Sequence, residues 1–472
     1  FDMLGEAART PSQADNYFNS YLNAIDEVGK INLVKNLSHG VSIKISALHP
    51  RYEMKKFDQV NLELIPRLKD LINHAYSKDV EITIDAEEQD RLSLSLHIIE
   101  QLAFEKKIKD WPHFGIALQA YGKRSFDAIE WFNNLLNRRA GMHLRLVKGA
   151  YWDFEIKHAQ VSGYEGYPVF SKKSITDIAY LACAKRILGN KNIYPKFATH
   201  NAHTISSINY LGNGCEYEFQ RLFGMGELLY KSASNILNLD KSPSVYAPIG
   251  NYKDLLPYLV RRLLENGANS SFINKYLNNS IPAMELAQNP GNKIMEEIDH
   301  LDISNLPLPR NLYLPRLNSH GFDLNEMDCI ENLMSKVNKF SELSFHAYSI
   351  SPHNPLKNLP IEITSKCNEK TIGFVETCDF KSIDVNCIHP SDQWTNCSIE
   401  SRNEILICVA DRLEDEQAKF VYLLMHEAGK TLEDALDEIR EAVDFLRYYS
   451  LQATNLQPVS QRGPTGEDNI LE

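Results

Sequence analysis

The feature that most constrains the fold is a repeated alternation of short β-type segments and amphipathic helical segments, which runs from the start of the chain to about residue 252. Helix-length segments such as 58–78, 125–139 and 174–189 separate most of the β-type ones. Repeated β-α units favour a parallel sheet, and eight of them predict a closed (βα)8 barrel of the TIM type, within the α/β class. The predicted strands are 1–4, 41–48, 81–87, 114–121, 143–152, 196–201, 217–224 and 245–250.

An open, doubly wound parallel sheet is the competing fold. In its dinucleotide-binding form, one strand runs into a G-x-G-x-x-G turn at the start of a helix. None of the predicted strands does so. The sequence therefore favours the barrel over that form of the open sheet.

The later part of the chain is organised differently, and the chain is too long for a single hydrophobic core. Five prolines lie between Pro282 and Pro315, which is typical of an extended linker. Beyond the linker, residues 340–395 predict a few irregular strands. We therefore predict three regions, which are a barrel over 1–280, a Pro-rich linker over 281–339 and a further region over 340–472.

Residues 400–454 predict two long amphipathic helices. Gly429 marks the break between them, and Thr431 is a candidate N-cap residue supported by Asp434 three positions later. No internal repeat or low-complexity tract is evident in the chain.

The bulk composition argues against some classes of protein. The formal net charge of −12 argues against a polyanion such as DNA as the main partner. No apolar run approaches the roughly 18–20 residues of a membrane-spanning helix. The eight cysteines form no C-x-x-C pair and no His/Cys metal spacing, so they indicate reduced thiols in a cytosolic protein. The chain opens on Phe1 rather than Met, and we expect residues to precede it.

The ends of the predicted strands are rich in polar side chains. In a barrel of this type the chemistry lies at the C-terminal ends of the strands, whereas strands buried on both faces should be almost continuously apolar. Several cations together with amide groups suit a large anionic cofactor with a heteroaromatic ring, walled by tyrosines and Trp152. The polar residues at the strand ends are Glu6, Lys44, Asp85, Glu87, Gln119, Tyr121, Arg145, Lys148, Tyr151, His200, Asn201, Arg221 and Tyr246.

The helix predicted over 255–266 carries a polar stripe. Tyr258, Arg261, Arg262 and Glu265 fall at i, i+3, i+4 and i+7 and therefore share one face. One interpretation is a solvated face with an Arg–Glu pair. The other is an anion clamp, because two guanidinium groups can hold a carboxylate in a fixed geometry. If the helix crosses the mouth of the barrel, the clamp is favoured.

Two other chemistries remain open from the residues alone. Lys44 or Lys148 could form a Schiff base with a substrate, as lysines do in barrel aldolases. His200 and His203 are spaced i, i+3, as in some metal sites. No third ligand lies at a fitting spacing, so we predict no metal.

Nine stretches of the sequence carry a family resemblance. They are FDMLGEAA, VSIKISALHPRYE, IDAEEQDRLSLSL, LRLVKGAYWDFEIKHAQ, GYPVF, FATHNAHT, YEFQRLFGMGE, VYAPIG and YLVRRLLENGANSSF. Together they resemble the proline dehydrogenase domain of the bacterial proline utilization A proteins, bifunctional flavoenzymes that oxidise proline to glutamate. They follow the family's order over nearly all of residues 1–275. The resemblance implies a distorted (βα)8 barrel that binds FAD non-covalently, with the last helix over the barrel mouth.

The resemblance also implies roles for individual residues through their positions in these motifs. The implied substrate-site residues are Lys44, Arg261 and Arg262 at the carboxylate, Tyr151, Leu222, Tyr246 and Tyr258 around the ring, Asp85 in the adjoining polar network, and Glu6 as a gate paired with an arginine of the last helix. The implied cofactor contacts are Gln119 and Arg145 at the flavin ring, and Lys148, Trp152, Lys173, His200, Asn201 and Glu265 along the rest of FAD. Around Lys173 the sequence FSKK departs from the commoner family pattern.

The implied reaction is the oxidation of L-proline to 1-pyrroline-5-carboxylate, the first step of proline breakdown to glutamate, by hydride transfer to the flavin. The hydride acceptor belongs to the cofactor, so no protein nucleophile is required. By resemblance, the electrons would pass to a membrane quinone. A cytoplasmic protein held peripherally at the inner face of the cytoplasmic membrane is therefore implied.

Residues 340–472 are similar to the N-terminal part of the family's second enzyme, an aldehyde dehydrogenase that uses NAD. The sequence ends before the NAD-binding and catalytic-cysteine regions of that enzyme, so we expect no such activity from this chain. We likewise expect no nucleic-acid partner, and the oligomeric state is not predicted. The alternatives to proline oxidation are a flavin-free Schiff-base barrel lyase and a non-catalytic sensor of proline or FAD.

Overall fold

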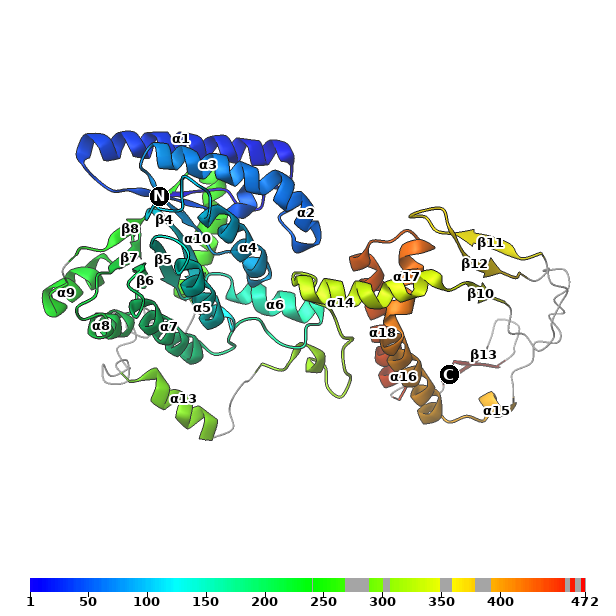
Figure 1. Ribbon diagram of the computed structural model, residues 1–472. Helices are drawn as coiled ribbons and strands as arrows, with labels where there is room; N and C mark the ends of the chain where they lie inside the picture. The colour runs from blue at the N-terminus through cyan, green and yellow to red at the C-terminus, as the bar shows by residue number, and fades with distance from the viewer. Residues whose placement is uncertain are drawn as a thin grey trace. The chain divides into compact units, whose positions relative to one another are not determined.

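The computed structural model describes residues 1–239, 241–267, 288–299, 306–348, 359–377, 392–454, 459–462 and 468–471. The chain divides into two compact units (Figure 1). The first consists of Phe1–Ala159 and Tyr167–Leu306, and the second of Gln160–Gly166 and Pro307–Glu472.

The first unit contains a parallel sheet that closes into a barrel. Its strand order is β8-β7-β6-β5-β4-β3-β2-β1-β9, and every neighbouring pair is parallel. β8 and β9 are consecutive parts of one strand separated by Ala247, and they join β7 on one side to β1 on the other. The predicted (βα)8 barrel is therefore confirmed. The strands are β1 (Asp2–Met3), β2 (Gly40–Ile43), β3 (Glu81–Ile84), β4 (Phe114–Gln119), β5 (Met142–Val147), β6 (Ile193–Ala198), β7 (Glu218–Leu222), β8 (Ser244–Tyr246) and β9 (Pro248–Ile249).

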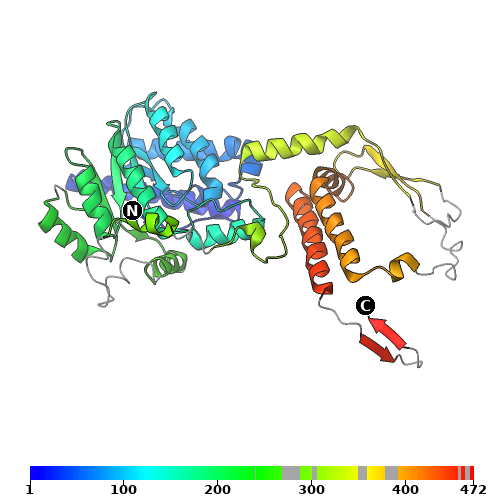
Figure 2. The same ribbon diagram turned by 90° about the horizontal axis from the view of Figure 1, so that it is seen from below.

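Helices surround this barrel, as Figures 1 and 2 show from two directions. The predicted helix over 58–78 is made of α2 (Phe57–Gln59), a π-helical turn (Val60–Leu64) and α3 (Ile65–Ser77). The first long helix begins where Thr10 caps it, because the Thr10 side chain accepts from Gln13 N. The other helices of the unit are α1 (Pro11–Lys35), α4 (Leu92–Ala103), α5 (Ser125–Leu136), α6 (Trp152–Ser162, whose last three residues belong to the second unit), α7 (Lys173–Leu188), α8 (Ala202–Leu211), α9 (Glu227–Leu237), α10 (Tyr252–Gly267) and α13 (Pro290–Asp299).

Polar and apolar side chains alternate along the barrel strands. On β3 the buried Ile82 and Ile84 alternate with Glu81 and Thr83. The polar set faces the inside, because Lys196 on β6 reaches Glu81 on β3, a strand that is not its neighbour. The interior of this barrel is therefore polar and its apolar residues face the helices, and Lys44 and Arg145 have the ion-pair partners that buried strand residues need.

Several strands end earlier than predicted. Residues 45–47 form a 3-10 helix rather than the end of a strand, and β5 and β6 end at Val147 and Ala198. Beyond these points the inward-facing polar residues sit on loops at one end of the barrel. That is where a site can form, because the backbone there is no longer committed to the sheet.

The Pro-rich segment is not extended throughout, so that part of the prediction is wrong. It contains α13 in the first unit and α14 (Met327–Asn338) in the second. Pro290 opens α13, where its fixed φ and missing N–H are tolerated. The prolines of this segment therefore mark a helix start as well as irregular chain.

The second unit combines a small sheet with a group of helices. β10 (Phe345–Ala347), β12 (Thr371–Val375) and β11 (Ile361–Thr364) form a three-stranded sheet, as the prediction of a few strands requires. Figures 1 and 2 show α16 and α18 side by side. Thr431 caps α18 by accepting from Asp434 N, as predicted. The remaining elements are α15 (Asp392–Thr395), α16 (Ile399–Asp415), α17 (Gln417–His426), α18 (Leu432–Ala453), β13 (Val459–Arg462) and β14 (Asp468–Leu471).

The predicted pair of helices over 400–454 is therefore a set of three, because the chain breaks at Glu416 as well as near Gly429. Their contact surfaces form an apolar core that includes Ala410, Val421 and Val443, all fully buried. Within the described ranges, no helix is both long enough and apolar enough to cross a membrane.

Candidate active site

A pocket of about 750 Å³ opens at the C-terminal ends of the barrel strands. Its walls come from the strand ends, from the loops that follow them and from α10, which contributes Tyr258, Arg261 and Arg262. The helix predicted to cross the barrel mouth therefore borders the pocket. The predicted site residues that line it are Lys44, Asp85, Gln119, Arg145, Lys148, Tyr151, Trp152, Lys173, His200, Asn201, Leu222, Tyr246, Tyr258, Arg261 and Arg262.

Two predicted residues stand apart from this lining. Glu6 contacts the pocket through Arg261, with which it forms an ion pair. Glu265 lies on α10, but its side chain is outside the described residues.

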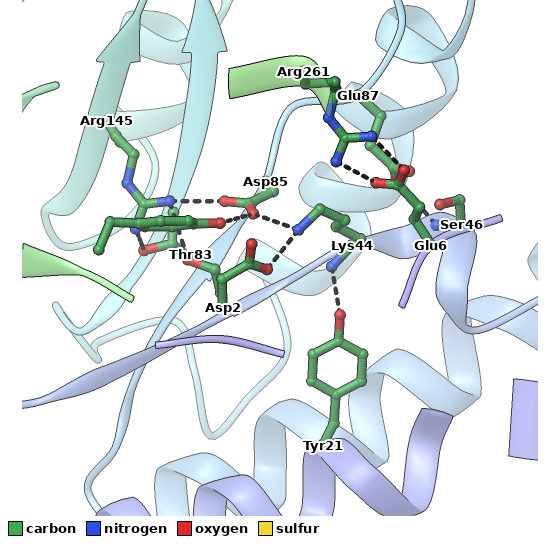
Figure 3. Close-up of polar contacts among 12 residues, drawn as sticks. Asp2, Glu6, Tyr21, Lys44, Ser46, Thr83, Asp85, Glu87, Arg145 and Arg261 are labelled. Carbon is green, nitrogen blue, oxygen red and sulfur yellow. Dashed lines mark hydrogen bonds and ion pairs between the residues drawn. The ribbon is translucent and has the colours of Figure 1, made fainter. Parts of the chain in front are cut away.

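Lys44 is held between two carboxylates at the floor of the pocket. Its Nζ is 2.5 Å from Asp2 Oδ1 and 3.3 Å from Asp85 Oδ2 (Figure 3). Burial opposes the charged ammonium, but Tyr246, Asp2 and Asp85 outweigh it and raise the pKa of Lys44. A Schiff-base lysine needs a lowered pKa to be nucleophilic. Lys44 is therefore suited to binding an anion and not to the lyase chemistry that the sequence left open.

Asp85 connects Arg145 to Tyr246 at the floor of the pocket. Its Oδ1 accepts from Arg145 Nη1 at 2.7 Å, and its Oδ2 accepts from the Tyr246 hydroxyl at 2.7 Å. Burial opposes the ionised carboxylate, but Lys44 and Arg145 outweigh it and lower the pKa of Asp85. Burial, together with Asp2 and Asp85, raises the pKa of Tyr246, so its hydroxyl stays protonated and donates.

Arg145 is fixed by four side chains from three strands, β2, β3 with the residue that follows it, and β7. Besides Asp85, it donates to Gln220 Oε1 from Nε at 2.8 Å and to Ser42 Oγ from Nη1 at 3.0 Å. It also donates from Nη2 to Thr83 Oγ1 at 3.3 Å. A guanidinium has five N–H donors. Four hydrogen bonds to described side chains orient the group, and it still borders the pocket.

We call α10 the lid helix because it borders the pocket. Its two arginines contact acidic and aromatic side chains. Arg261 makes a two-point ion pair with Glu6, through Nη1 and through Nη2 to Oε2 at 2.9 Å. Its guanidinium lies 5.3 Å from the Tyr151 ring centroid, and that of Arg262 lies 5.4 Å from the Tyr258 ring centroid. Cations stacked on aromatic faces keep a fixed orientation while their N–H edges point outward. This arrangement suits a clamp better than a solvated face.

On the other side of the pocket, two lysines share one carboxylate. Lys148 and Lys173 both donate to Asp177 on α7, the latter at 3.0 Å to Oδ2. Nearby, the Trp152 indole donates to Phe170 O at 2.9 Å, which fixes the ring at the rim. Two adjacent ammonium groups at the rim of a pocket suit a phosphate group.

His200 is a neutral ring with a defined proton. Burial, with Arg262 and Arg221 nearby, lowers the pKa of His200 to about 4. Its Nε2 accepts from Leu222 N at 3.1 Å, so the ring proton lies on Nδ1. The following Asn201 caps α8 by accepting from Thr204 N. Within the described ranges, no group of three His, Cys, Asp or Glu residues is arranged to hold a metal ion.

Gln119 braces two loops rather than pointing freely into the pocket. Its Nε2 donates to Glu87 O at 2.7 Å, and its Oε1 accepts from Ala150 N at 3.0 Å. Glu87 is one of the strand-end residues, but it does not line the pocket. Its carboxylate accepts from Ser46 N at 3.0 Å and pairs with Arg91 at 3.1 Å.

Three residues of the site were not selected from the sequence. Asp2 forms the closer of the two ion pairs of Lys44, Gln220 accepts a hydrogen bond from Arg145, and Asp177 accepts from both Lys148 and Lys173. The period of two along a strand could have found Gln220, because it lies two residues before Leu222 on β7 and so shares its face. Asp2 and Asp177 needed the three-dimensional pairing.

Known proteins are similar to this chain over nearly its whole length. Residues 1–275 match the proline dehydrogenase family, and residues 356–471 match the aldehyde dehydrogenase family. The bifunctional protein PutA of Salmonella typhimurium is 40% identical over 96% of this chain and 36% of its own length. PutA of Rhizobium meliloti is 34% identical over 98% of this chain and 39% of its own length.

Solved structures of proline utilization A proteins are also similar to this chain. A crystal structure of a point mutant of proline utilization A (PutA) from Bradyrhizobium japonicum has a TM-score of 0.84 and 38% identity, and covers 100% of this chain and 46% of that one. The chain thus spans less than half the length of these relatives. Because the family match covers residues 1–275, more than half of this chain, the chain belongs to the proline dehydrogenase family, a family of oxidoreductases.

Proposed function

We propose that this chain oxidises L-proline to 1-pyrroline-5-carboxylate and that a non-covalently bound FAD accepts the hydride. The observation that carries the proposal is that one pocket gathers two sets of cations with different partners, which we take as its two sides. The first side is Lys44, held by Asp2 and Asp85, with Arg261 and Arg262 of α10, and the second is Lys148 and Lys173, which share Asp177. Arg145 borders the same pocket, and by family resemblance it contacts the flavin ring.

The first side suits a small amino acid. Lys44 supplies an ammonium whose pKa is raised by its acidic neighbours, and the two arginines supply planar forks that match a carboxylate. Tyr151, Tyr258 and Leu222 supply apolar surface for a ring. Held this way, a bound proline presents its ring carbon in one orientation, which is the main contribution that positioning makes to rate.

The second side fits a flavin dinucleotide. The Asp177-linked lysines suit the diphosphate, and the neutral His200 offers an Nδ1–H donor. Gly149 has a φ of +141°, and a Cβ atom there would lie 2.4 Å from the Tyr121 ring, so only glycine fits this loop beside the pocket. When bound, the cofactor supplies the hydride acceptor.

No protein nucleophile is needed for this reaction, and the floor carries none. Lys44 is held as an ammonium and Asp85 as a carboxylate, so both act as fixed charges. We propose that these two charges orient the substrate, and that the cations beside it, which are Lys44, Arg261 and Arg262, favour its neutral amine. The Tyr246 hydroxyl, which donates to Asp85, keeps that carboxylate from turning toward the substrate.

The rest of the proposal rests on family membership. It comprises a cytoplasmic protein, peripheral at the membrane, that passes electrons to a quinone. It also includes the three regions 1–280, 281–339 and 340–472, the last being the start of an aldehyde dehydrogenase domain. Where that domain is complete, NAD would be its cofactor.

The visible spectrum tests the proposal. The chain loaded with FAD should show flavin absorbance, L-proline should bleach it without oxygen, and a dye should be reduced in turnover. Pyrrolidine, which lacks the carboxylate, is the matched control and should bleach the flavin far more slowly. Spectral change without bleaching would indicate a sensor, and proline turnover without bound flavin would indicate a lyase.

A further inference from the structure

Below the pocket, the barrel interior holds a second polar layer that the proposed function does not use, which we call the lower layer. Lys196 on β6 forms ion pairs with Glu81 on β3 and with Glu218 on β7, the latter at 3.7 Å. His143 on β5 lies in this layer and is 1% exposed. A glycine makes room for its ring, because a Cβ atom at Gly115 would lie 2.2 Å from His143 Cδ2. The layer is therefore built to hold a buried histidine.

Two side chains connect this layer to Arg145. Gln220 accepts from Arg145 Nε at 2.8 Å and donates from its own Nε2 to Glu218 at 2.7 Å. Thr83 accepts from Arg145 Nη2 at 3.3 Å, as Figure 3 shows, and its Oγ1 lies 2.8 Å from His143 Nε2. Thr83 is 2% exposed, so water does not replace its contacts.

The Thr83 hydroxyl accepts from Arg145 and still has one proton to donate. We assign that proton to His143 Nε2, which lies 2.8 Å away. Burial lowers the pKa of His143 to about 3, so the ring is neutral and can accept there. The ring proton then lies on Nδ1, which is 3.9 Å from Glu81 Oε2.

Arg145 therefore donates hydrogen bonds toward both the pocket and the lower layer. Asp85 accepts from Nη1 at 2.7 Å on the pocket side, whereas Thr83 accepts from Nη2 at 3.3 Å on the side of the lower layer. A charge-assisted bond to a carboxylate is stronger than one to a hydroxyl. Without the Thr83 hydroxyl, Nη2 loses this contact, and we expect the guanidinium to shift toward Asp85.

We propose that Thr83 and His143 are positioning residues for the guanidinium of Arg145, and that through it they set the reduction potential of the flavin. The inference rests on the proposed function, in which Arg145 faces the flavin ring. A cation held in a fixed place in a water-poor interior stabilises negative charge that appears near it. A reduced flavin is more electron-rich than an oxidised one, so a displaced guanidinium should make reduction less favourable.

The test compares three variants of the full chain, each loaded with FAD. Thr83→Val removes the hydroxyl and keeps the branched shape, whereas Thr83→Ser keeps the hydroxyl. Ile98→Val, on the buried face of α4, is the stability control, because it removes one buried methylene and changes no polar group. Flavin content, Tm and the midpoint potential against a reference dye are measured for each.

We expect Thr83→Val to bind flavin and to shift the flavin reduction equilibrium by about tenfold toward the oxidised form, which is about 30 mV for a two-electron couple. Thr83→Ser and Ile98→Val should keep the wild-type potential. If Thr83→Val does not fold, His143→Leu serves in its place, because it removes the acceptor for the Thr83 proton. A wild-type potential in the folded variant overturns the positioning role. Failure of the wild-type chain to bind flavin overturns the proposed function instead.

Discussion

Glu6 and Arg261 are separated by 255 positions in the sequence and form a two-point ion pair at the mouth of the barrel. Glu6 follows the first barrel strand, and Arg261 lies on α10, the helix that follows the last. The pair therefore fastens the lid helix to the start of the barrel. It also occupies the guanidinium that the proposed function assigns to the substrate carboxylate, so substrate and Glu6 compete for one group.

This competition predicts the effect of Glu6→Gln. Without the carboxylate at position 6, Arg261 is available to the substrate from the start and the lid is less firmly held. We expect a carboxylate inhibitor to bind more tightly and its dissociation rate to change, while the rate of flavin reduction at saturating proline falls less than twofold. Stopped-flow reduction separates the two steps. A reduction rate that collapses as far as turnover would contradict a gate role.

Arg262→Lys tests the clamp on the lid helix. The variant keeps the charge but loses the planar fork and its stacking on Tyr258. Removing one partner of a buried charged contact costs roughly 2–5 kcal/mol. At about 1.4 kcal/mol per decade, this is roughly 30-fold to a few thousand-fold in apparent affinity. We expect most of the loss in KM, because the carboxylate is remote from the bond that breaks.

Arg261→Met and Arg262→Met should show losses of the same kind, with flavin content checked in each. The alternative of a solvated Arg–Glu face predicts a small stability change, at most about 1 kcal/mol, and unaltered kinetics. Wild-type proline kinetics in all three variants, with normal flavin content, would therefore rule out the clamp.

The sequence predicted the barrel and most of the pocket for a physical reason. Parallel strands carry their ends to one rim, so Lys44, Asp85 and Arg145 had to converge once the strands were placed. The partners of these residues were harder to predict. Asp2 is one acidic residue in a two-residue strand, and only the β1–β2 pairing brings it to Lys44. The lower layer around His143 was not predicted, because barrel geometry directs attention to the ends of the strands and His143 lies near the start of β5.

Asp2→Asn tests a residue that only the structure identified. Asp2 is 2% exposed, and its Oδ1 is the closer of the two carboxylate contacts of Lys44. With the charge removed, Lys44 should move toward Asp85 and weaken the Asp85–Arg145 contact. We expect a rise in KM for proline of at least tenfold, with a smaller fall in kcat and little loss of flavin.

The exposed pair of Glu27 and Lys30 on α1 supplies the control for Asp2→Asn. Glu27→Gln removes a carboxylate from an ion pair far from the pocket lining and should leave both constants unchanged. Equal kinetics in Asp2→Asn and Glu27→Gln would mean that Lys44 does not depend on Asp2.

The last prediction concerns Glu155, a buried carboxyl on α6. Its Oε1 accepts from Gln89 N at 2.8 Å and from the Tyr121 hydroxyl at 3.0 Å. Its Oε2 is buried and has no hydrogen-bond partner among the described residues. Burial, reinforced by Asp90 and Glu88, raises the pKa of Glu155 from 4.5 to about 7. The folded state therefore prefers the protonated carboxyl.

The sign of the effect follows from linkage. Between pH 4.5 and about 7 the unfolded chain releases this proton while the folded chain keeps it, so stability falls as pH rises through that window. The full loss is on the order of 3 kcal/mol at about 1.4 kcal/mol per pKa unit.

Glu155→Gln keeps the shape and the Oε1 acceptor but cannot ionise. Its unfolding free energy, relative to wild type, should therefore rise from pH 5 to pH 8. Glu130→Gln, on the exposed face of α5, is the control and should show a much smaller change. A constant difference between wild type and Glu155→Gln across this range would show that Glu155 ionises in the folded protein as it does in water.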